Sequence, residues 1–290
     1  MKTMQYNLTD KTTIEHLIGA EDFRFSKSLG QNFIINPDVC PRIAAESGID
    51  RDCGVIEIGP GIGVLTAELC KLAGKVVSIE LDTKLAPILK KTLADFENSE
   101  VIYADALKTD IPALIEEKFP GMRVCVCANL PYYITTPIIM HLLRNGRGIE
   151  SITVMVQKEA AARLCAKVGS RESGAITAAV DYYCEAQKLF DVGKNSFMPA
   201  PKVDSSVIKL TLREKPPVEV NDEAFFFSVI KAAFGQRRKT ALNSLSSGLS
   251  LPKSVISQAL ADCGFETTVR AETMTMEDFA ALTQAIENVK

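Results

Sequence analysis

Histidine is scarce in this sequence of 290 residues, which contains only His16 and His141. Neither stands in a spacing typical of metal ligands, so we expect no metal site and no serine-type triad. The eight cysteines include no Cys-x-x-Cys pair, which favours reduced thiols in a cytoplasmic protein. The sequence contains no run of about 18 uncharged apolar residues, so we expect no membrane span. The N-terminal residues lack the apolar core of a signal peptide.

The composition is that of a chain with a substantial core, because 47% of the residues are hydrophobic and 24% are charged. Its length fits one large domain, or one large domain with a small one. The formal net charge of −3 argues weakly against a nucleic-acid partner. A basic face can be offset by an acidic back, however, so local clusters of cations decide this question.

Strand and helix patterns alternate through the first half of the chain. Short apolar runs predict strands at 55–58, 75–80, 101–103, 122–128 and 151–156. Helices are expected between them, since apolar residues recur there at a spacing of three or four. This alternation is typical of a doubly wound parallel sheet with helices on both faces, a Rossmann-like α/β fold. A further alternating strand at 206–212 is expected to join the sheet antiparallel.

The pattern changes after Glu214-Lys-Pro-Pro217, where the prolines mark a boundary. Beyond it the strand signals stop, and helices are predicted at 222–235, 239–249, 252–264 and 276–289. We therefore expect a polar N-terminal arm at 1–28, an α/β domain at 29–213 and a small all-helical domain at 214–290. The arm includes one short helix, for which Thr12 or Thr13 is the expected N-cap.

A glycine-rich turn follows the first predicted strand of the sheet, with Gly59, Gly61 and Gly63 at alternate positions. Glycines let a ligand approach the backbone, although glycine turns after strands are common. The next two strands end in Glu80 and Asp105. A carboxylate at the first position typically holds two ribose hydroxyls, and one at the second can accept from an adenine amino group. Each acid alone could be a solvated strand end, but the three strand ends together indicate a nucleoside site.

The ligand of this site is expected to carry no phosphate. No P-loop pattern is present, and the glycine turn contains no lysine or arginine. S-adenosylmethionine has adenine, ribose and a sulfonium cation but no phosphate, so it fits this distribution of charge. We therefore predict S-adenosylmethionine as the cofactor and methyl transfer as the reaction.

The fourth predicted strand ends in Asn129-Leu130-Pro131-Tyr132. The Asn129 side chain and the Leu130 carbonyl offer two acceptors for an exocyclic NH2 group, and Tyr132 offers a stacking face for the base. An adenine amino nitrogen is a poor nucleophile, because its lone pair is delocalised into the ring. Two acceptors would favour a pyramidal nitrogen aimed at the methyl group, so positioning supplies most of the catalysis. An ordinary Asn-x-Pro turn is the alternative for these four residues alone.

Two further segments bear on the target. In a proline-stiffened loop, Phe197 is a candidate second wall for the base, and Lys202 is a candidate phosphate contact. A rigid surface loop with Phe197 in the core is the alternative. Between two predicted helices, Arg237, Arg238 and Lys239 form the densest positive cluster of the sequence. Such a cluster suits contact with RNA phosphates, whereas a solvated turn is the alternative.

This set of motifs resembles that of the ribosomal RNA adenine N6,N6-dimethyltransferases, and within them the small-subunit (16S) enzymes of bacteria. The resemblance extends from about Phe23 to Met274. The matching segments, in chain order, are Lys27-Ser-Leu-Gly-Gln-Asn-Phe33, Glu57-Ile-Gly-Pro-Gly-Ile-Gly63, Glu80, Asp105-Ala106, Asn129-Leu-Pro-Tyr132, Phe197-x-Pro-x-Pro-Lys-Val-Asp-Ser205 and Gln236-Arg-Arg-Lys-Thr240. Together, and in this order, they are highly specific.

The resemblance implies a class I methyltransferase sheet whose cofactor site includes Asn32 and Ile34, just after the N-terminal arm. The family usually has leucine at the position of Ile34. The other cofactor residues that it implies are Gly59, Glu80, Asp105 and Asn129. It also implies the substrate: two adjacent adenosines of a hairpin loop near the 3′ end of 16S rRNA, each methylated twice. The helical domain is then expected to bind RNA of a 30S subunit or its precursor, and we expect a monomer.

Two rival functions remain open. A resistance-type methyltransferase of 23S rRNA has the same fold, but the segments 201–205 and 236–240 favour the 16S branch. A non-catalytic nucleic-acid-binding factor of this fold is the other rival. The intact Glu80, Asp105 and Asn129 argue against an abandoned active site.

Overall fold

The computed structural model describes residues 6–21, 23 and 30–289, and the chain forms two compact units. The sheet unit comprises Met1–Ala161 and Gln187–Leu212, and the helical unit comprises Ala162–Ala186 and Arg213–Lys290. The chain thus leaves the sheet unit, returns to it and leaves again. The 29–213 domain expected from the sequence includes residues 162–186, whereas these residues group with the C-terminal helices in the structure.

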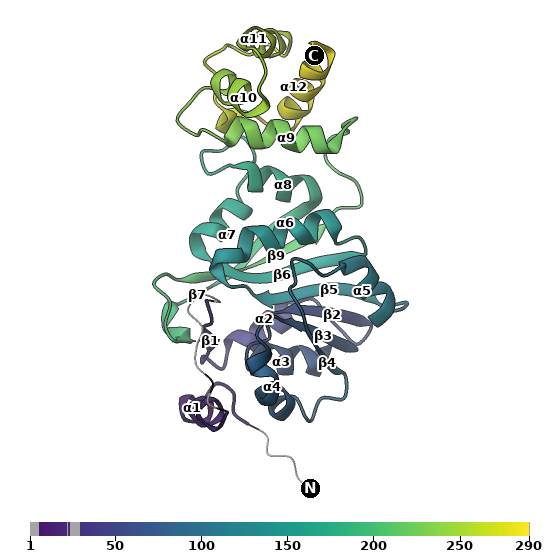
Figure 1. Cartoon of the computed structure of the whole chain (residues 1–290), viewed down its shortest axis with the longest axis vertical. Helices are drawn as coiled ribbons and strands as arrows, with labels where there is room; N and C mark the ends of the chain where they lie inside the picture. Colours follow the sequence, from purple (N-terminus) through teal and green to yellow (C-terminus); the bar gives the residue numbers. More distant parts are fainter. Residues whose placement is uncertain (1–5, 22, 24–29, 290) are drawn as a thin grey trace. The chain divides into compact units, whose positions relative to one another are not determined.

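A seven-stranded sheet is the centre of the sheet unit, with the strand order β4-β3-β2-β5-β6-β9-β7 (Figure 1). Its strands are β2 (Cys53–Ile58), β3 (Lys75–Glu80), β4 (Ser99–Tyr103), β5 (Arg123–Asn129), β6 (Ile149–Gln157), β7 (Cys184–Val192) and β9 (Ser205–Leu212). The first five in this order pair in parallel, and β9 pairs antiparallel with β6. The predicted α/β sheet and its antiparallel addition are therefore confirmed.

Burial on both faces explains the sequences of the central strands. All six residues of β2 are buried, and so are residues 124–128 in β5. Parallel strands that are covered on both faces have continuous apolar sequences rather than alternating ones. The order of the strands along the chain reverses between β2 and β5. At such a switch point, open α/β sheets bind their ligands beyond the carboxyl ends of the strands.

The sheet unit carries α1 (Lys11–Ala20), α2 (Val39–Ser47), α3 (Val64–Leu72), α4 (Ala86–Thr92), α5 (Ile111–Lys118) and α6 (Thr135–Asn145), and α7 (Lys158–Leu164) begins in it. α2 packs against α3, and α5 packs against α6. The expected N-cap of α1 at Thr12 or Thr13 is wrong. The cap is Asp10, whose carboxylate accepts a hydrogen bond from the Thr13 N–H at 2.8 Å. An aspartate just before the first turn satisfies the unpaired N–H groups there.

A second sheet has only two short strands, β1 (Phe33–Ile34) and β8 (Phe197–Met198), which pair antiparallel. This pairing is not predictable from the sequence, because two-residue strands carry no periodicity. The pairing sets Ile34 opposite Phe197. It ties residues 30–36, called the strap below, to the loop that follows β7.

The helical unit contains α8 (Ala175–Tyr183), α9 (Glu223–Phe234), α10 (Ala241–Leu249), α11 (Lys253–Asp262) and α12 (Met276–Val289), and the last four lie in the predicted ranges. Rings from two segments pack together in its core. The Tyr182 ring centroid lies 5.5 Å from that of Phe226 and 5.2 Å from that of Phe227. In the described part of the chain, no helix has the length and apolar character needed to cross a membrane.

Candidate active site

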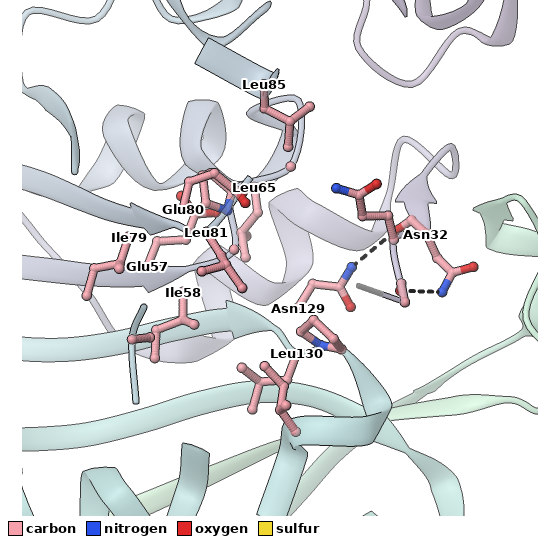
Figure 2. Close-up of a pocket in the computed structure, with 18 of the residues that line it drawn as sticks. Asn32, Glu57, Ile58, Leu65, Ile79, Glu80, Leu81, Leu85, Asn129 and Leu130 are labelled. Carbon is pink, nitrogen blue, oxygen red and sulfur yellow. Dashed lines mark hydrogen bonds between the residues drawn. The ribbon is translucent and has the colours of Figure 1, made fainter. Parts of the chain in front are cut away.

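A cavity opens at the carboxyl ends of β2, β3, β4 and β5 in the sheet unit, and Figure 2 shows part of its lining. The strap, the glycine turn, the ends of four parallel strands and the loop after β7 all contribute to its lining. The predicted site residues that line it are Asn32, Ile34, Gly59, Gly61, Glu80, Asp105, Asn129, Leu130, Tyr132 and Phe197. The parallel topology explains this convergence, because it brings the carboxyl ends of distant strands to one edge. Their individual roles stay predictions.

The glycine turn after β2 presents bare backbone to the cavity. Gly59 and Gly61 have φ angles of 72° and 60°, in the left-handed region that other residues rarely adopt. A Cβ built on Gly59 would meet no other atom within 4 Å, so it would take up open space beside the cavity. A Cβ on Gly61 would lie 3.4 Å from the Phe33 ring. The turn therefore leaves room for a ligand against its main chain.

Glu80 is the last residue of β3, and its side chain is buried. Its Oε1 accepts a hydrogen bond from the Asp82 N–H at 2.7 Å. Burial raises the pKa of this carboxyl group, and hydrogen bonds from the backbone N–H groups of Asp82, Gly61 and Leu81 lower it. One carboxylate oxygen is thus held by the backbone. Such a fixed carboxylate is a suitable acceptor for paired hydroxyl groups.

Asp105 follows β4 and is half-buried. Its Oδ1 accepts a hydrogen bond from the Leu107 N–H at 3.0 Å, and its Oδ2 lies 3.6 Å from the Lys108 Nζ. The first of these contacts is that of an Asx turn, so Asp105 shapes the loop after β4 as well as lining the cavity. Its contact with an adenine amino group stays a prediction.

Asn129 ends β5 at the edge of the cavity. Its Nδ2 donates to the backbone oxygen of Asn32 in the strap, at 3.5 Å, and its side-chain oxygen points away from this contact (Figure 2). The Leu130 N–H donates to the Met155 oxygen of β6 at 3.2 Å. Pro131 follows with φ at −57°. Because β6 and the proline ring fix the two sides of Leu130, its carbonyl has a defined direction next to the Asn129 amide.

Two aromatic side chains complete this end of the cavity. The Tyr132 hydroxyl hydrogen-bonds to the Ser205 hydroxyl at 2.7 Å, and burial raises the pKa of the phenol. Phe197 is 4% exposed and packs in a buried cluster with Ile34. It also lines the cavity. Phe197 therefore lies in the core, as the alternative interpretation of this loop expects. Its ring also borders the site.

The predicted RNA contacts do not line the cavity. Lys202 is exposed on the loop between β8 and β9. Arg237, Arg238 and Lys239 are exposed between α9 and α10 in the helical unit. Arg237 donates a hydrogen bond to the backbone oxygen of Arg171 at 3.0 Å, which keeps its side chain against its own unit. RNA binding by these four cations stays a prediction.

Glu57, which has no role predicted from the sequence, lies in β2 and lines the cavity. Its Oε2 accepts hydrogen bonds from the Thr66 hydroxyl at 2.6 Å and the Ser78 hydroxyl at 2.7 Å. Burial raises the pKa of this carboxyl group to about 7, and the two hydroxyls lower it. The signal in the sequence that singles out Glu57 is an acidic residue inside an otherwise apolar strand. Within the described ranges, no three His, Cys, Asp or Glu side chains are grouped to hold a metal ion.

The chain is similar in sequence to proteins of one known family. The family model of ribosomal RNA adenine dimethylase matches residues 22–288. A protein of Shouchella clausii named ribosomal RNA small subunit methyltransferase A is 48% identical over 267 residues, which cover 91% of this chain and 90% of that protein. Its namesake from Bacillus licheniformis is 45% identical over 290 residues, with 99% of both chains covered.

Solved structures agree with these relatives. A dimethyladenosine transferase from Plasmodium falciparum has a TM-score of 0.72 at 27% identity, covering 88% of this chain and 98% of that one. The 23S rRNA methyltransferase ErmE has a TM-score of 0.65 at 27% identity, covering 88% and 99%. The class I methyltransferase fold is thereby confirmed. The extent of the family match and the identity to its members lead to one conclusion: the chain belongs to the ribosomal RNA adenine dimethylase family.

Proposed function

We propose that this protein transfers methyl groups to N6 of two adjacent adenosines in a 3′-terminal hairpin loop of 16S rRNA. The product is N6,N6-dimethyladenosine, formed during small-subunit biogenesis. The chain is an S-adenosylmethionine-dependent methyltransferase, as its family is. The observation that carries the proposal is that a glycine turn and two strand-end acids meet Asn129 and Leu130 at one cavity.

The cavity suits S-adenosylmethionine, which supplies an electrophilic methyl group on a sulfonium when bound. The backbone at Gly59 and Gly61 leaves space that a Cβ would fill. Glu80 is the proposed acceptor for the ribose hydroxyls, and Asp105 for the adenine amino group. Asn32 and Ile34 border the same cavity from the strap. The absence of lysine and arginine from the cavity lining, within the described residues, matches a ligand that carries no phosphate.

Asn129 and Leu130 are the proposed catalytic acceptors. The Asn129 Oδ1 and the Leu130 carbonyl would each take one hydrogen of the adenine amino group. The nitrogen would then become pyramidal, and its lone pair, no longer delocalised into the ring, would face the methyl group. As the new N–C bond forms, the S–C bond breaks and leaves a thioether, and the methylated nitrogen, now acidic, releases a proton. Positioning of this kind lowers the barrier without a strong general base. Tyr132 would stack on the base, an interaction worth about 1–3 kcal/mol, and Phe197 borders the base from the loop after β7.

RNA binding is assigned to Lys202, Arg237, Arg238 and Lys239, as contacts to phosphates. The substrate is proposed to be 16S rRNA within a 30S subunit or its precursor, and the protein to act as a cytoplasmic monomer. Two relatives at 45% and 48% identity carry the small-subunit name. The 23S rRNA methyltransferase is only 27% identical, so that alternative is not favoured.

A substrate comparison tests this function. Labelled S-adenosylmethionine is offered to unmethylated 30S particles, 50S particles and free rRNA, and the products are mapped by mass spectrometry. We expect label on two adjacent adenosines of 16S rRNA, with two methyl groups on each. Label confined to 23S rRNA would select the resistance-type enzyme. Failure to bind the cofactor in calorimetry would select the non-catalytic factor.

A further inference from the structure

We propose that Gln31 and Asp82 are positioning residues, and that their hydrogen bond fastens the strap to the turn that orients the Glu80 carboxylate. The proposal rests on the proposed role of Glu80, which is to hold the ribose of the cofactor. Gln31 and Asp82 act through Glu80 and the strap. They are not assigned a part in methyl transfer itself.

The contacts form a continuous chain from the strap to Glu80. Gln31 Nε2 donates to Asp82 Oδ2 at 2.9 Å, in a partly buried position and across 51 residues of sequence. The other carboxylate oxygen, Oδ1, accepts from the Lys84 N–H at 3.1 Å, where a short 3₁₀ turn begins. The N–H of Asp82 donates to Glu80 Oε1 at 2.7 Å. Asp82 therefore binds Gln31 of the strap through its side chain and the Glu80 carboxylate through its backbone N–H.

The strap has separate attachments to the other side of the cavity. The backbone oxygen of Asn32 accepts from the Asn129 amide, and the Ile35 N–H donates to the Ser196 oxygen at 2.8 Å. Phe33 lies in a buried apolar cluster with Leu85. Two consecutive residues of the strap thus contact the two sides of the cavity, Gln31 at Asp82 beside Glu80 and Asn32 at the proposed acceptor Asn129. Gln31 and Asp82 supply a polar attachment at the Glu80 end.

This arrangement couples the two ends of the cavity. A hydrogen bond between an amide and a carboxylate is charge-assisted and has a directional preference. When it is formed, it adds an anchor from the strap to the turn at 82–84, which the Asp82 side chain already caps and whose Asp82 N–H sets the direction of the Glu80 carboxylate. We therefore expect loss of the bond to weaken cofactor binding, while the apolar contacts of Phe33 keep the strap folded.

A swap of the two side chains tests the proposal. Gln31→Glu sets a second carboxylate against Asp82, which replaces the bond by repulsion. Adding Asp82→Asn restores one carboxylate and one amide in reversed order, at the charge of the wild-type pair. Affinity for S-adenosylhomocysteine, measured by calorimetry, should fall on the order of tenfold in Gln31→Glu and return to within about threefold of wild type in the double variant.

Enzyme kinetics give a second readout. KM for S-adenosylmethionine should rise by the same factor in Gln31→Glu, with kcat at saturating cofactor within about twofold of wild type. Gln258→Glu is the matched control, because Gln258 Nε2 donates to Asp262 Oδ1 at 2.7 Å on α11. That variant makes the same chemical change beside a carboxylate, and it should leave cofactor affinity unchanged.

Two results would overturn the proposal: wild-type affinity in Gln31→Glu, or a loss of affinity that the double variant does not recover. Glu80→Gln separates this failure from failure of the proposed function. If Glu80→Gln weakens cofactor binding and Gln31→Glu does not, only the positioning role is lost. If Glu80→Gln itself binds as wild type does, the ribose role of Glu80 is wrong and the proposal falls with it.

Discussion

Replacing Glu57 by glutamine should remove a pH dependence from the stability of this protein. Glu57 is 1% exposed, and its Oε2 accepts hydrogen bonds from Thr66 and Ser78. Burial raises the pKa of the carboxyl group from 4.5 to about 7; the two hydroxyls oppose this, and the charge of Glu80 adds to it. A glutamine keeps an oxygen that can accept from both hydroxyls, and it does not ionise.

The sign follows from proton binding. Between pH 4.5 and 7 the folded protein keeps a proton on Glu57 that the unfolded chain has released. The stability that this proton contributes is fully present below pH 4.5 and is lost as the pH rises through 7. Since one pKa unit corresponds to about 1.4 kcal/mol, the shift corresponds to roughly 3 kcal/mol of unfolding free energy. At pH 8 the wild type holds a buried charge, and Glu57→Gln does not.

Urea unfolding followed by circular dichroism measures the effect. From pH 4.5 to 8, the unfolding free energy of Glu57→Gln should gain roughly 3 kcal/mol relative to wild type. Glu97→Gln, which removes an exposed carboxylate from the same unit, is the matched control and should show no such gain. Parallel pH curves for wild type and Glu57→Gln would refute the account of Glu57 as a buried acid with a raised pKa.

Three further predictions concern other parts of the chain. Replacing the three cations at 237–239 by neutral residues should weaken rRNA binding and reduce its log–log salt slope by roughly 2; an unchanged slope would make the junction a solvated turn. In native protein, a thiol reagent should modify Cys165 and Cys263 well before the six buried cysteines. Equal labelling rates would contradict the burial. Gly54→Ala should cost about 1–3 kcal/mol in urea unfolding, because its Cβ would lie 2.2 Å from the Phe119 ring; wild-type stability would show that the ring moves freely.

The sheet and most of the cavity lining could be predicted because their signals are local. β2 and β5 are continuous apolar runs, and in a parallel sheet such runs place their carboxyl ends at one edge. The acids and amides that follow the runs must then lie near one another. Glu80 and Asn129 come from strands that are not neighbours, yet both border the cavity for this reason.

The contacts of the strap could not be predicted, since they depend on pairings across long stretches of sequence. β1 and β8 have two residues each, too few for any periodicity. Gln31 meets Asp82 across 51 residues, and neither residue type alone indicates a partner. Glu57 was visible as an acid in an apolar strand, but the hydroxyls that accommodate it come from α3 and β3.

The division into units was only partly accessible from the sequence. The prolines near 216–217 mark the last passage of the chain between the units. The earlier excursion at 162–186 carries no comparable boundary, because α7 runs across its start and β7 across its end. α8 belongs to the helical unit because Tyr182 packs with the aromatic residues of α9, a contact between distant segments of the chain.

Single-turnover methyl transfer to 30S particles by Asn129→Ala tests directly whether Asn129 and Leu130 hold the adenine amino group. We expect a rate lower by about 10²-fold or more, because one of the two acceptors of the adenine amino group is lost. S-adenosylhomocysteine affinity by calorimetry should stay within a few-fold of wild type. Asn145→Ala, at an exposed asparagine of α6, should change neither quantity. An unchanged rate in Asn129→Ala would show that Asn129 is not an acceptor for the adenine amino group.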